Sequence, residues 1–199
     1  MVNKINIGVV GIQGAISEHI LSMQKALNET KTSGKVSIIK YKKDLKDVDA
    51  IILPGGESTT ISRVLDETGL YNEVIKRIKQ NNLPIMGTCA GCVLLSKKLN
   101  NDSEDVKLLK AMDIEVKRNA FGRQKESFEQ KIRISGFNRP YTAVFIRAPT
   151  IEKVWGNCKP LAKIDNKTVM ARQNNFLALS FHPELTDDSR IHKYFLKMI

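Results

Sequence analysis

Short apolar runs alternate with helical patterns along the first half of the chain. Four runs have the length and composition of buried strands: Ile5–Val10, Val36–Tyr41, Ala50–Leu53 and Pro84–Met86. Between them, apolar residues recur every three or four positions, a period that predicts helices. These helices are expected from Ser17 onward and over Thr59–Asp66, Asn72–Gln80 and Ala90–Leu99. Strands that alternate with helices indicate βαβ units and a parallel sheet.

The second half changes character, because short strand candidates follow one another with only turn residues between them. They are Ile114–Val116, Gln130–Ile134, Thr142–Ile146, Leu161–Ile164, Thr168–Arg172 and Phe176–Phe181. A final helix is predicted over Asp187–Met198. We therefore expect a mixed sheet with an antiparallel portion. A length of 199 residues fits one domain spanning 1–199.

Composition narrows the class of protein. Apolar residues make up 42% of the chain, no stretch approaches the ~18 consecutive apolar residues of a membrane helix, and no cleavage site follows the N-terminal apolar run. The net charge of +11 invites a nucleic-acid interpretation, but the Lys and Arg residues are scattered and form no dense basic run. Three cysteines are too few for a disulfide framework, so we expect a reducing cytoplasm.

Unusual residues follow three of the predicted strands. The segments are PGGEST at 54–59, GTCAG at 87–91 and HPE at 182–184. In open α/β sheets, ligands bind beyond the carboxyl ends of the strands. These three segments are therefore the candidate site.

Cys89 lies between a short strand and a helix that starts almost at once. Gly87 and Gly91 flank it in the pattern of a nucleophile elbow, with cysteine in place of serine. The positive end of the helix dipole favours a thiolate there, and the following backbone N–H groups are free to bind an oxyanion. The alternative is a buried cysteine that acts only as a small apolar residue.

Cys92 is the second cysteine of a C-x-x-C pair, and its neighbours Val93–Leu95 are apolar. We expect it to be core packing. A thioredoxin-like redox pair stays an alternative, because such a pair occupies the same strand-to-helix position. A metal site would need two more ligands, and Cys158 is the only other cysteine, so we expect neither metal nor cofactor.

A cysteine nucleophile needs a base, and His182 follows a predicted strand at the same sheet edge. Glu184, two residues later, is able to accept a hydrogen bond from the imidazole and fix its tautomer, which gives a Cys-His-Glu triad. A histidine at a strand end without catalytic function is the alternative. His19 and His192 lie in the first and last predicted helices among residues typical of a surface.

The glycines of PGGEST allow a ligand to approach the backbone. A backbone N–H of Gly55 or Gly56 would complete an oxyanion hole, and Ser58 would cap the following helix. No Lys stands here as a phosphate loop requires, and Glu57 favours a cationic group instead.

In this order and spacing, PGGEST, GTCAG and FHPEL resemble the class I, triad-type glutamine amidotransferases. GVVGIQGAISEHI, KRNAFGRQKESFE, FIRAP and SFHPELTDD further resemble the glutaminase subunits of pyridoxal 5′-phosphate synthase, and these motifs span residues 8–188. The family usually has an aliphatic residue in place of Cys92, and a Gly-Leu-like pair in place of Lys110 and Ala111.

The resemblance implies a flavodoxin-like, three-layer α/β fold with a mixed central sheet, and hydrolysis of L-glutamine to L-glutamate and ammonia. It implies that Cys89 is the nucleophile, His182 the base and then the acid, and Glu184 the orienting carboxylate. It places an oxyanion hole at Gly56 and Ala90. The implied glutamine contacts are Gly56, Glu57, Ser58, Arg123, Ile146 and Arg147.

The resemblance also implies a partner. In the family, ammonia passes to a separate (β/α)8-barrel synthase subunit, and twelve synthases assemble with twelve glutaminases. A glutaminase that serves imidazole glycerol phosphate synthase is a sister alternative, against which RNAFGRQ and FIRAP argue. A thiol-redox protein and a non-catalytic binding module remain the alternatives from other classes.

Overall fold

The computed structural model describes residues 4–100, 105–120 and 127–199. Its main sheet has ten strands in the order β2-β1-β3-β4-β12-β11-β9-β6-β5, and β10 pairs with β11. The strands are β1 (Ile5–Val10), β2 (Gly34–Ile39), β3 (Ala50–Leu53), β4 (Ile85–Thr88), β5 (Ser96–Leu99), β6 (Met112–Lys117), β9 (Thr150–Val154), β10 (Lys159–Ile164), β11 (Lys167–Gln173) and β12 (Phe176–Leu179). The strands from β2 to β12 pair in parallel, whereas β11 is antiparallel to all three of its neighbours. The predicted mixed sheet is confirmed.

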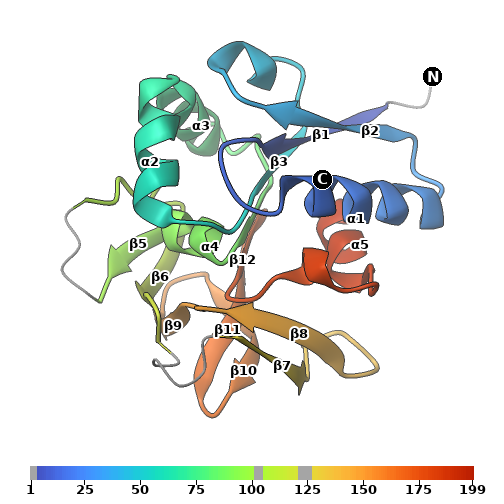
Figure 1. Cartoon of the computed structure of the whole chain (residues 1–199), viewed down its shortest axis with the longest axis vertical. Coiled ribbons are helices and arrows are strands. Elements are labelled where there is room, and N and C mark those ends of the chain that lie inside the picture. Colours follow the sequence, from blue (N-terminus) through green and yellow to red (C-terminus); the bar gives the residue numbers. More distant parts are fainter. Residues whose placement is uncertain (1–3, 101–104, 121–126) are drawn as a thin grey trace.

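Helices cover both faces of the parallel part of the sheet and make three layers (Figure 1). On one face lie α1 (Ile16–Glu29) and α5 (Arg190–Leu196), which pack against each other. On the other lie α2 (Ser58–Glu67), α3 (Leu70–Lys79) and α4 (Ala90–Leu95). Within the described residues, no helix is long and apolar enough to cross a membrane.

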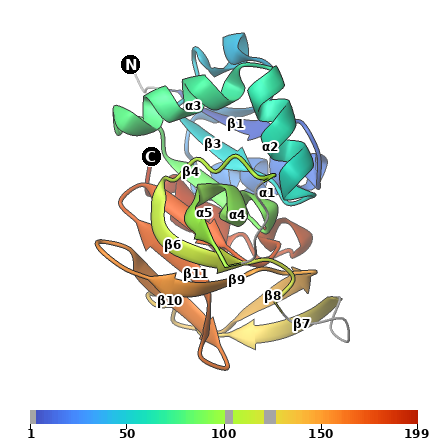
Figure 2. The same cartoon turned by 90° about the vertical axis from the view of Figure 1, so that its left-hand side faces the viewer.

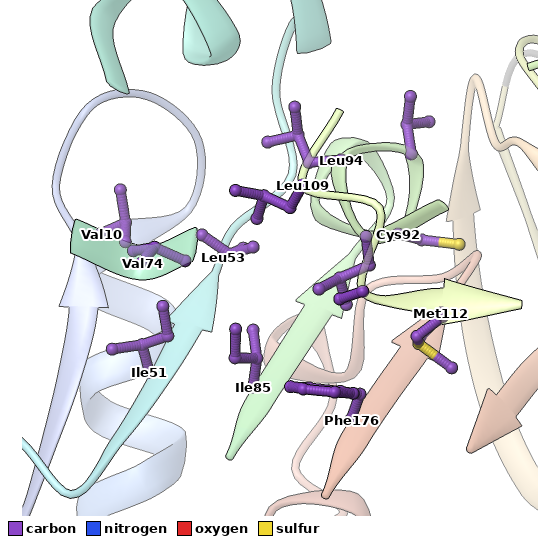
Figure 3. Close-up of a cluster of buried hydrophobic side chains, with 14 of the residues drawn as sticks. Val10, Ile51, Leu53, Val74, Ile85, Cys92, Leu94, Leu109, Met112 and Phe176 are labelled. Atoms are coloured by element: carbon purple, nitrogen blue, oxygen red, sulfur yellow. The ribbon is translucent and has the colours of Figure 1, made fainter. Parts of the chain in front are cut away.

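The core is divided by the sheet, because successive side chains of a strand point to opposite faces. Ile51 and Leu53 of β3 join the cluster under α2, α3 and α4, whereas Ala50 and Ile52 join the cluster under α1 and α5. Figure 3 shows part of the first cluster, with Cys92 among its members. Burial on both faces explains why the parallel strands read as unbroken apolar runs.

A two-stranded antiparallel sheet lies apart from the main sheet (Figure 2). It consists of β7 (Ser127–Ile132) and β8 (Tyr141–Ile146). Tyr141 and Phe145 of β8 are fully buried in the second core cluster. β7 overlaps the predicted strand Gln130–Ile134 and begins before it, and its pairing to β8 rather than to the main sheet was not predicted.

Part of the predicted helix Ala90–Leu99 is wrong. The helix ends at Leu95, and the next four residues form β5, which pairs in parallel with β6. Ser96 has extended backbone angles, and its hydroxyl donates a hydrogen bond of 2.8 Å to the carbonyl of Val93, which closes the last turn. Sheet pairing with residues that follow in the chain overrides a local pattern that suits either structure. The strand β9 was also missed.

The centre of the sheet positions the site. Gly87 of β4 pairs with Leu53 of β3 on one side and with Ala178 of β12 on the other. The three strands run in parallel, so their carboxyl ends emerge at one edge, side by side. The segments PGGEST, GTCAG and HPE follow these three ends, as predicted.

Candidate active site

Cys89 stands on a sharp turn between β4 and α4. Its backbone has φ 49° and ψ −104°, a conformation that costs energy for any residue with a side chain. One hydrogen bond holds the turn, and one close approach of the backbone requires a glycine. The Cys89 N–H donates to the carbonyl of Leu179 at 2.8 Å, and a Cβ on Gly91 would lie 2.2 Å from the carbonyl oxygen of Leu53. Residue 91 must therefore be glycine for α4 to start so close to β3. The predicted sharp turn from strand to helix at Cys89 is confirmed.

His182 reaches the same edge from β12. Its backbone N–H donates to the carbonyl of Val144 in β8 at 2.8 Å, and a short 3-10 helix, η2 (Pro183–Leu185), follows it. The ring nitrogen Nδ1 lies 2.7 Å from Oε1 of Glu184, whose side chain is fully buried. Cys89 lies close enough to the imidazole to raise the pKa of His182, and its sulfur lies 3.8 Å from the carbonyl oxygen of Ile146. The three predicted triad residues are thus gathered at one place.

His182 and Glu184 each favour the charged form of the other. Burial by itself lowers the pKa of His182, but the hydrogen bonds and charges of Cys89 and Glu184 outweigh burial and raise it from 6.5 to about 10. Burial by itself raises the pKa of Glu184, but the hydrogen bond from His182 and the neighbouring histidines hold it below its ordinary value. His182 is therefore able to hold a proton at neutral pH beside the ionised carboxylate of Glu184.

The PGGEST loop closes over the imidazole. A Cβ on Gly55 would lie 2.5 Å from Cε1 of His182, so this position accepts only glycine without moving the ring. The predicted cap of α2 was wrong: the N-cap residue is Glu57, not Ser58, and its carboxylate accepts hydrogen bonds from the N–H groups of Thr59 and Thr60 at 3.1 and 2.7 Å. Although partial burial raises the pKa of Glu57, these bonds lower it to about 2.

A cavity of about 500 Å³ lies over Cys89. Most of the predicted site residues line it: Gly56, Glu57, Ser58, Cys89, Ala90, Ile146, Arg147 and His182. Glu184 does not, since it lies buried behind His182. Arg123 lies outside the described residues. Two larger hollows, of about 780 and 880 Å³, contain none of these residues and lie away from the chemistry.

Three polar residues of the cavity, Gln13, Arg118 and Asn119, were not predicted, and two of them contact Glu57. Gln13 accepts a hydrogen bond of 2.9 Å from the N–H of Glu57, and Arg118 lies 3.3 Å from the Glu57 carboxylate. Their places in GVVGIQGA and KRNAFGRQ, two segments that carried the resemblance, were the available signal.

The two helical histidines are not on the surface, and that expectation was wrong. His19 of α1 and His192 of α5 are both completely buried, with ring centroids 6.1 Å apart. His19 Nε2 lies 3.4 Å from Oε2 of Glu184 and 3.2 Å from the hydroxyl of Thr88. The faces of α1 and α5 that meet each other enclose these rings, and a pattern within either helix does not reveal that.

Cys92 lies one turn beyond Cys89 and is completely buried in the first core cluster. Burial raises its pKa far above the ordinary value. Cys158, which is also buried, has its pKa raised to about 12 for the same reason. Both side chains are packing residues in this structure, as predicted for Cys92. Among the described residues, no group of three or more His, Cys, Asp or Glu is arranged to hold a metal ion.

Comparison with known proteins gives one consistent result. The model of the SNO glutamine amidotransferase family matches residues 9–199. The chain is 47% identical to the pyridoxal 5′-phosphate synthase subunit PdxT of Pyrococcus abyssi, over 96% of this chain and 97% of that protein. It is 49% identical to the PdxT subunit of Methanococcoides burtonii, over 96% of each chain.

Solved structures agree. A crystal structure of a glutamine amidotransferase superposes with a TM-score of 0.86 at 40% identity, over 96% of this chain and 97% of that one. The PurLQS structure from Thermotoga maritima has a TM-score of 0.64 at 14% identity, over 99% of this chain and 98% of that one, and shows a shared fold only.

Proposed function

The chain belongs to the SNO glutamine amidotransferase family, and we propose that Cys89, His182 and Glu184 are the triad with which it hydrolyses L-glutamine to L-glutamate and ammonia for the synthesis of pyridoxal 5′-phosphate. The observation that carries the assignment is that Cys89 and His182 line one cavity, with the imidazole of His182 held at 2.7 Å by the buried carboxylate of Glu184. The names of the PdxT relatives support the pathway.

The first half of the reaction forms a thioester. In the proposed step, the Cys89 thiol passes its proton to His182, and the resulting thiolate attacks the side-chain amide carbon of glutamine. The carbonyl electrons move to oxygen and give a tetrahedral intermediate. His182 then donates its proton to the nitrogen, ammonia leaves, and a glutamyl thioester stays on Cys89.

The second half returns the enzyme to its starting state. The imidazole of His182 is now neutral and accepts a proton from water, whose oxygen attacks the thioester carbon. Collapse of the second tetrahedral intermediate breaks the carbon–sulfur bond and restores the thiolate beside protonated His182. Glu184 stays ionised throughout, holds Nδ1–H and stabilises the imidazolium, as the third member of a triad does.

The backbone N–H groups of Gly56 and Ala90 are the proposed oxyanion hole. Ala90 is the first residue of α4, where backbone N–H groups lack partners within the helix. Gly56 lines the same cavity from the opposite loop and has φ 137°, which a residue with a side chain rarely adopts. Two donors from two loops would bind the charge that develops on the amide oxygen.

The proposed glutamine contacts are Gly56, Glu57, Ser58, Arg123, Ile146 and Arg147. A carboxylate that stays ionised suits the ammonium of glutamine, and Glu57 meets that requirement. An arginine suits the α-carboxylate because of its paired donors. Ile146 supports this part of the proposal, since its carbonyl lies 3.8 Å from the Cys89 sulfur, next to the place where the amide would bind.

The proposed partner is a (β/α)8-barrel synthase subunit that receives the ammonia, in an assembly of twelve copies of each. The word "subunit" in the names of the relatives supports a partner, and the family resemblance supports its type. The three unpaired thiols support a cytoplasmic location.

A matched pair of cysteine variants tests the chemistry. In the presence of the synthase, Cys89→Ala is expected to abolish glutamate release, whereas Cys92→Ala is expected to keep it. Equal loss from both variants, or turnover that requires a dithiol, would point to redox chemistry instead.

A second experiment tests the pathway. The protein, the candidate synthase and glutamine are mixed, and glutamate and pyridoxal 5′-phosphate are followed together. Activation by this synthase supports the proposal. Activation only by a different synthase would overturn the pathway and keep the hydrolysis.

A further inference from the structure

His19 touches the far side of the proposed triad. It comes from α1, in the layer opposite to α4, and it is completely buried. Its Nε2 faces two groups from two other elements: Oε2 of Glu184 in η2 at 3.4 Å, and Oγ1 of Thr88 at the end of β4 at 3.2 Å. Both partners are buried as well.

The partners decide which nitrogen of His19 carries the proton. An ionised carboxylate only accepts hydrogen bonds, and the pKa of Glu184 lies below its ordinary value, so Nε2 must carry a hydrogen to face Oε2 favourably. Burial lowers the pKa of His19 more than the charge of Glu184 raises it. His19 is therefore neutral, with a hydrogen on Nε2 and an acceptor at Nδ1, which has no hydrogen-bond partner among the described residues.

A neutral donor at this place solves a specific problem of the triad. Glu184 has two carboxylate oxygens, and Oε1 is held by His182 at 2.7 Å. Without His19, no donor from the described side chains would face Oε2, and a buried anionic oxygen without a donor is costly. A positively charged side chain at the position of His19 would compete with protonated His182 for Glu184, whereas a neutral imidazole does not.

The contacts also close a ring. Cys89 contacts His182, His182 contacts Glu184, and Glu184 faces His19. His19 contacts Thr88, which precedes Cys89 in the chain. The hydrogen bond that His19 Nε2 forms in this structure is the one with Thr88, and Oε2 of Glu184, 3.4 Å from Nε2, has no hydrogen-bond partner among the described residues. An ordinary N–H···O bond measures about 2.7–3.2 Å, and catalytic hydrogen bonds are often long before substrate binds.

From this arrangement we propose that His19 is a positioning residue for glutamine hydrolysis, a neutral donor that fixes the Glu184 carboxylate and links it through Thr88 to the strand that presents Cys89. The inference rests on the triad assigned above. His19 does not line the cavity over Cys89, so it acts through Glu184 and not on glutamine.

Other groups face His19 and must be separated from its effect. His192 of α5 is its neighbour at 6.1 Å between ring centroids, and both of its nitrogens are buried without hydrogen-bond partners in the described part of the chain. Glu18 of α1 and His182 act on His19 through their charges. His192 is of the same residue type and equally buried, but neither of its nitrogens forms a hydrogen bond with the triad, so it is the matched control.

Three substitutions of His19 divide the possible effects. His19→Leu removes the donor and keeps the bulk. His19→Gln places an amide N–H close to the position of Nε2, whereas His19→Asn places one close to Nδ1, where it does not reach Glu184. Each variant and His192→Leu are assayed as the complete chain with the synthase present, and thermal unfolding is recorded for all four.

We expect His19→Leu and His19→Asn to lower kcat by about 10- to 100-fold, the range known for loss of a hydrogen-bond partner that orients a metal ligand from outside. The KM for glutamine should stay nearly constant, and His19→Gln should recover most of the lost kcat. His192→Leu should keep kcat even where its unfolding temperature falls as far as that of His19→Leu.

Three results would overturn the inference: an unchanged kcat in His19→Leu, equal losses in the Gln and Asn variants, or an equal loss in His192→Leu. Cys89→Ala and His182→Asn are measured in the same series. Full activity in those two variants would reject the triad itself, whereas their inactivity beside a fully active His19→Leu would reject only the function of His19.

Discussion

Gly55 offers a direct test of how closely the imidazole must be held. Gly55→Ala adds one methyl group, whose carbon would lie 2.5 Å from Cε1 and 3.3 Å from Nδ1 of His182. Carbon atoms in contact prefer about 3.5 Å or more. The ring must therefore move by about 1 Å, the difference between 3.5 Å and the 2.5 Å of the unrelaxed contact.

A displacement of this size acts on both sides of the ring. On one side lies the Cys89 sulfur, and on the other the 2.7 Å contact to Glu184. A misplacement of about 1 Å in a reacting group costs on the order of 100-fold in rate. An inserted methyl group in a packed site costs about 1–3 kcal/mol of stability. The protein should therefore stay folded and lose about 100-fold in kcat.

The assay is steady-state glutamate release with the synthase present, together with chemical unfolding. Gly136→Ala is the control: Gly136 has φ 85°, and nothing lies within 4 Å of an added Cβ, so this variant is strained without touching the site. It should lose about 1 kcal/mol of stability and keep its activity. Full activity in Gly55→Ala would show that His182 needs no fixed position, and it would refute the geometric reasoning.

Three further predictions follow from the charges and packing around the site. Glu184→Gln should destabilise the fold most below about pH 6.5 and progressively less as pH rises through about 10, because the raised pKa of His182 means that the folded state holds this proton more tightly than the unfolded state. Urea unfolding of both proteins at pH 6, 8 and 10 measures the effect, and a loss of unfolding free energy that grows with pH would contradict it. Cys92→Ala should cost about 1–2 kcal/mol in unfolding free energy with kcat unchanged, and a large loss of kcat would mean that Cys92 takes part in the chemistry. Glu57→Ala should cost about 1 kcal/mol through loss of the helix cap and raise the KM for glutamine, whereas Glu57→Asp should keep the cap and still raise KM; an unchanged KM in both variants would remove Glu57 from substrate binding.

Much of the fold was predictable because its strands are buried on both faces. An apolar run such as Ala50–Leu53 has few other structures open to it, and the glycines and prolines around it mark where it ends. The three segments that form the candidate site were predictable for the same reason, since each follows such a run. The elbow around Cys89 needed only Gly87, Gly91 and the strand before them.

The errors occurred where the deciding partner lies far away in the chain. Ser96–Leu99 suits a helix or a strand locally, and its pairing with Met112–Lys117 makes it a strand. A tertiary contact therefore selected between two locally acceptable conformations. The cap of α2 is the exception, because it is decided locally: Ser58 is a good helix cap by type, but Glu57 reaches the free N–H groups with a longer side chain.

The histidines show most clearly what the sequence determines and what the tertiary structure decides. The sequence by itself determined the order of strands and helices, the elbow at Cys89 and the short step from His182 to Glu184, because these depend on neighbours within a few residues. Only the tertiary structure brought His19 from the first helix to the far oxygen of Glu184, since that contact requires α1 to pack against a loop 165 residues later in the chain, counted from 19 to 184. A side chain in an amphipathic helix shows its own polarity, but the neighbouring elements decide whether it meets water or a carboxylate.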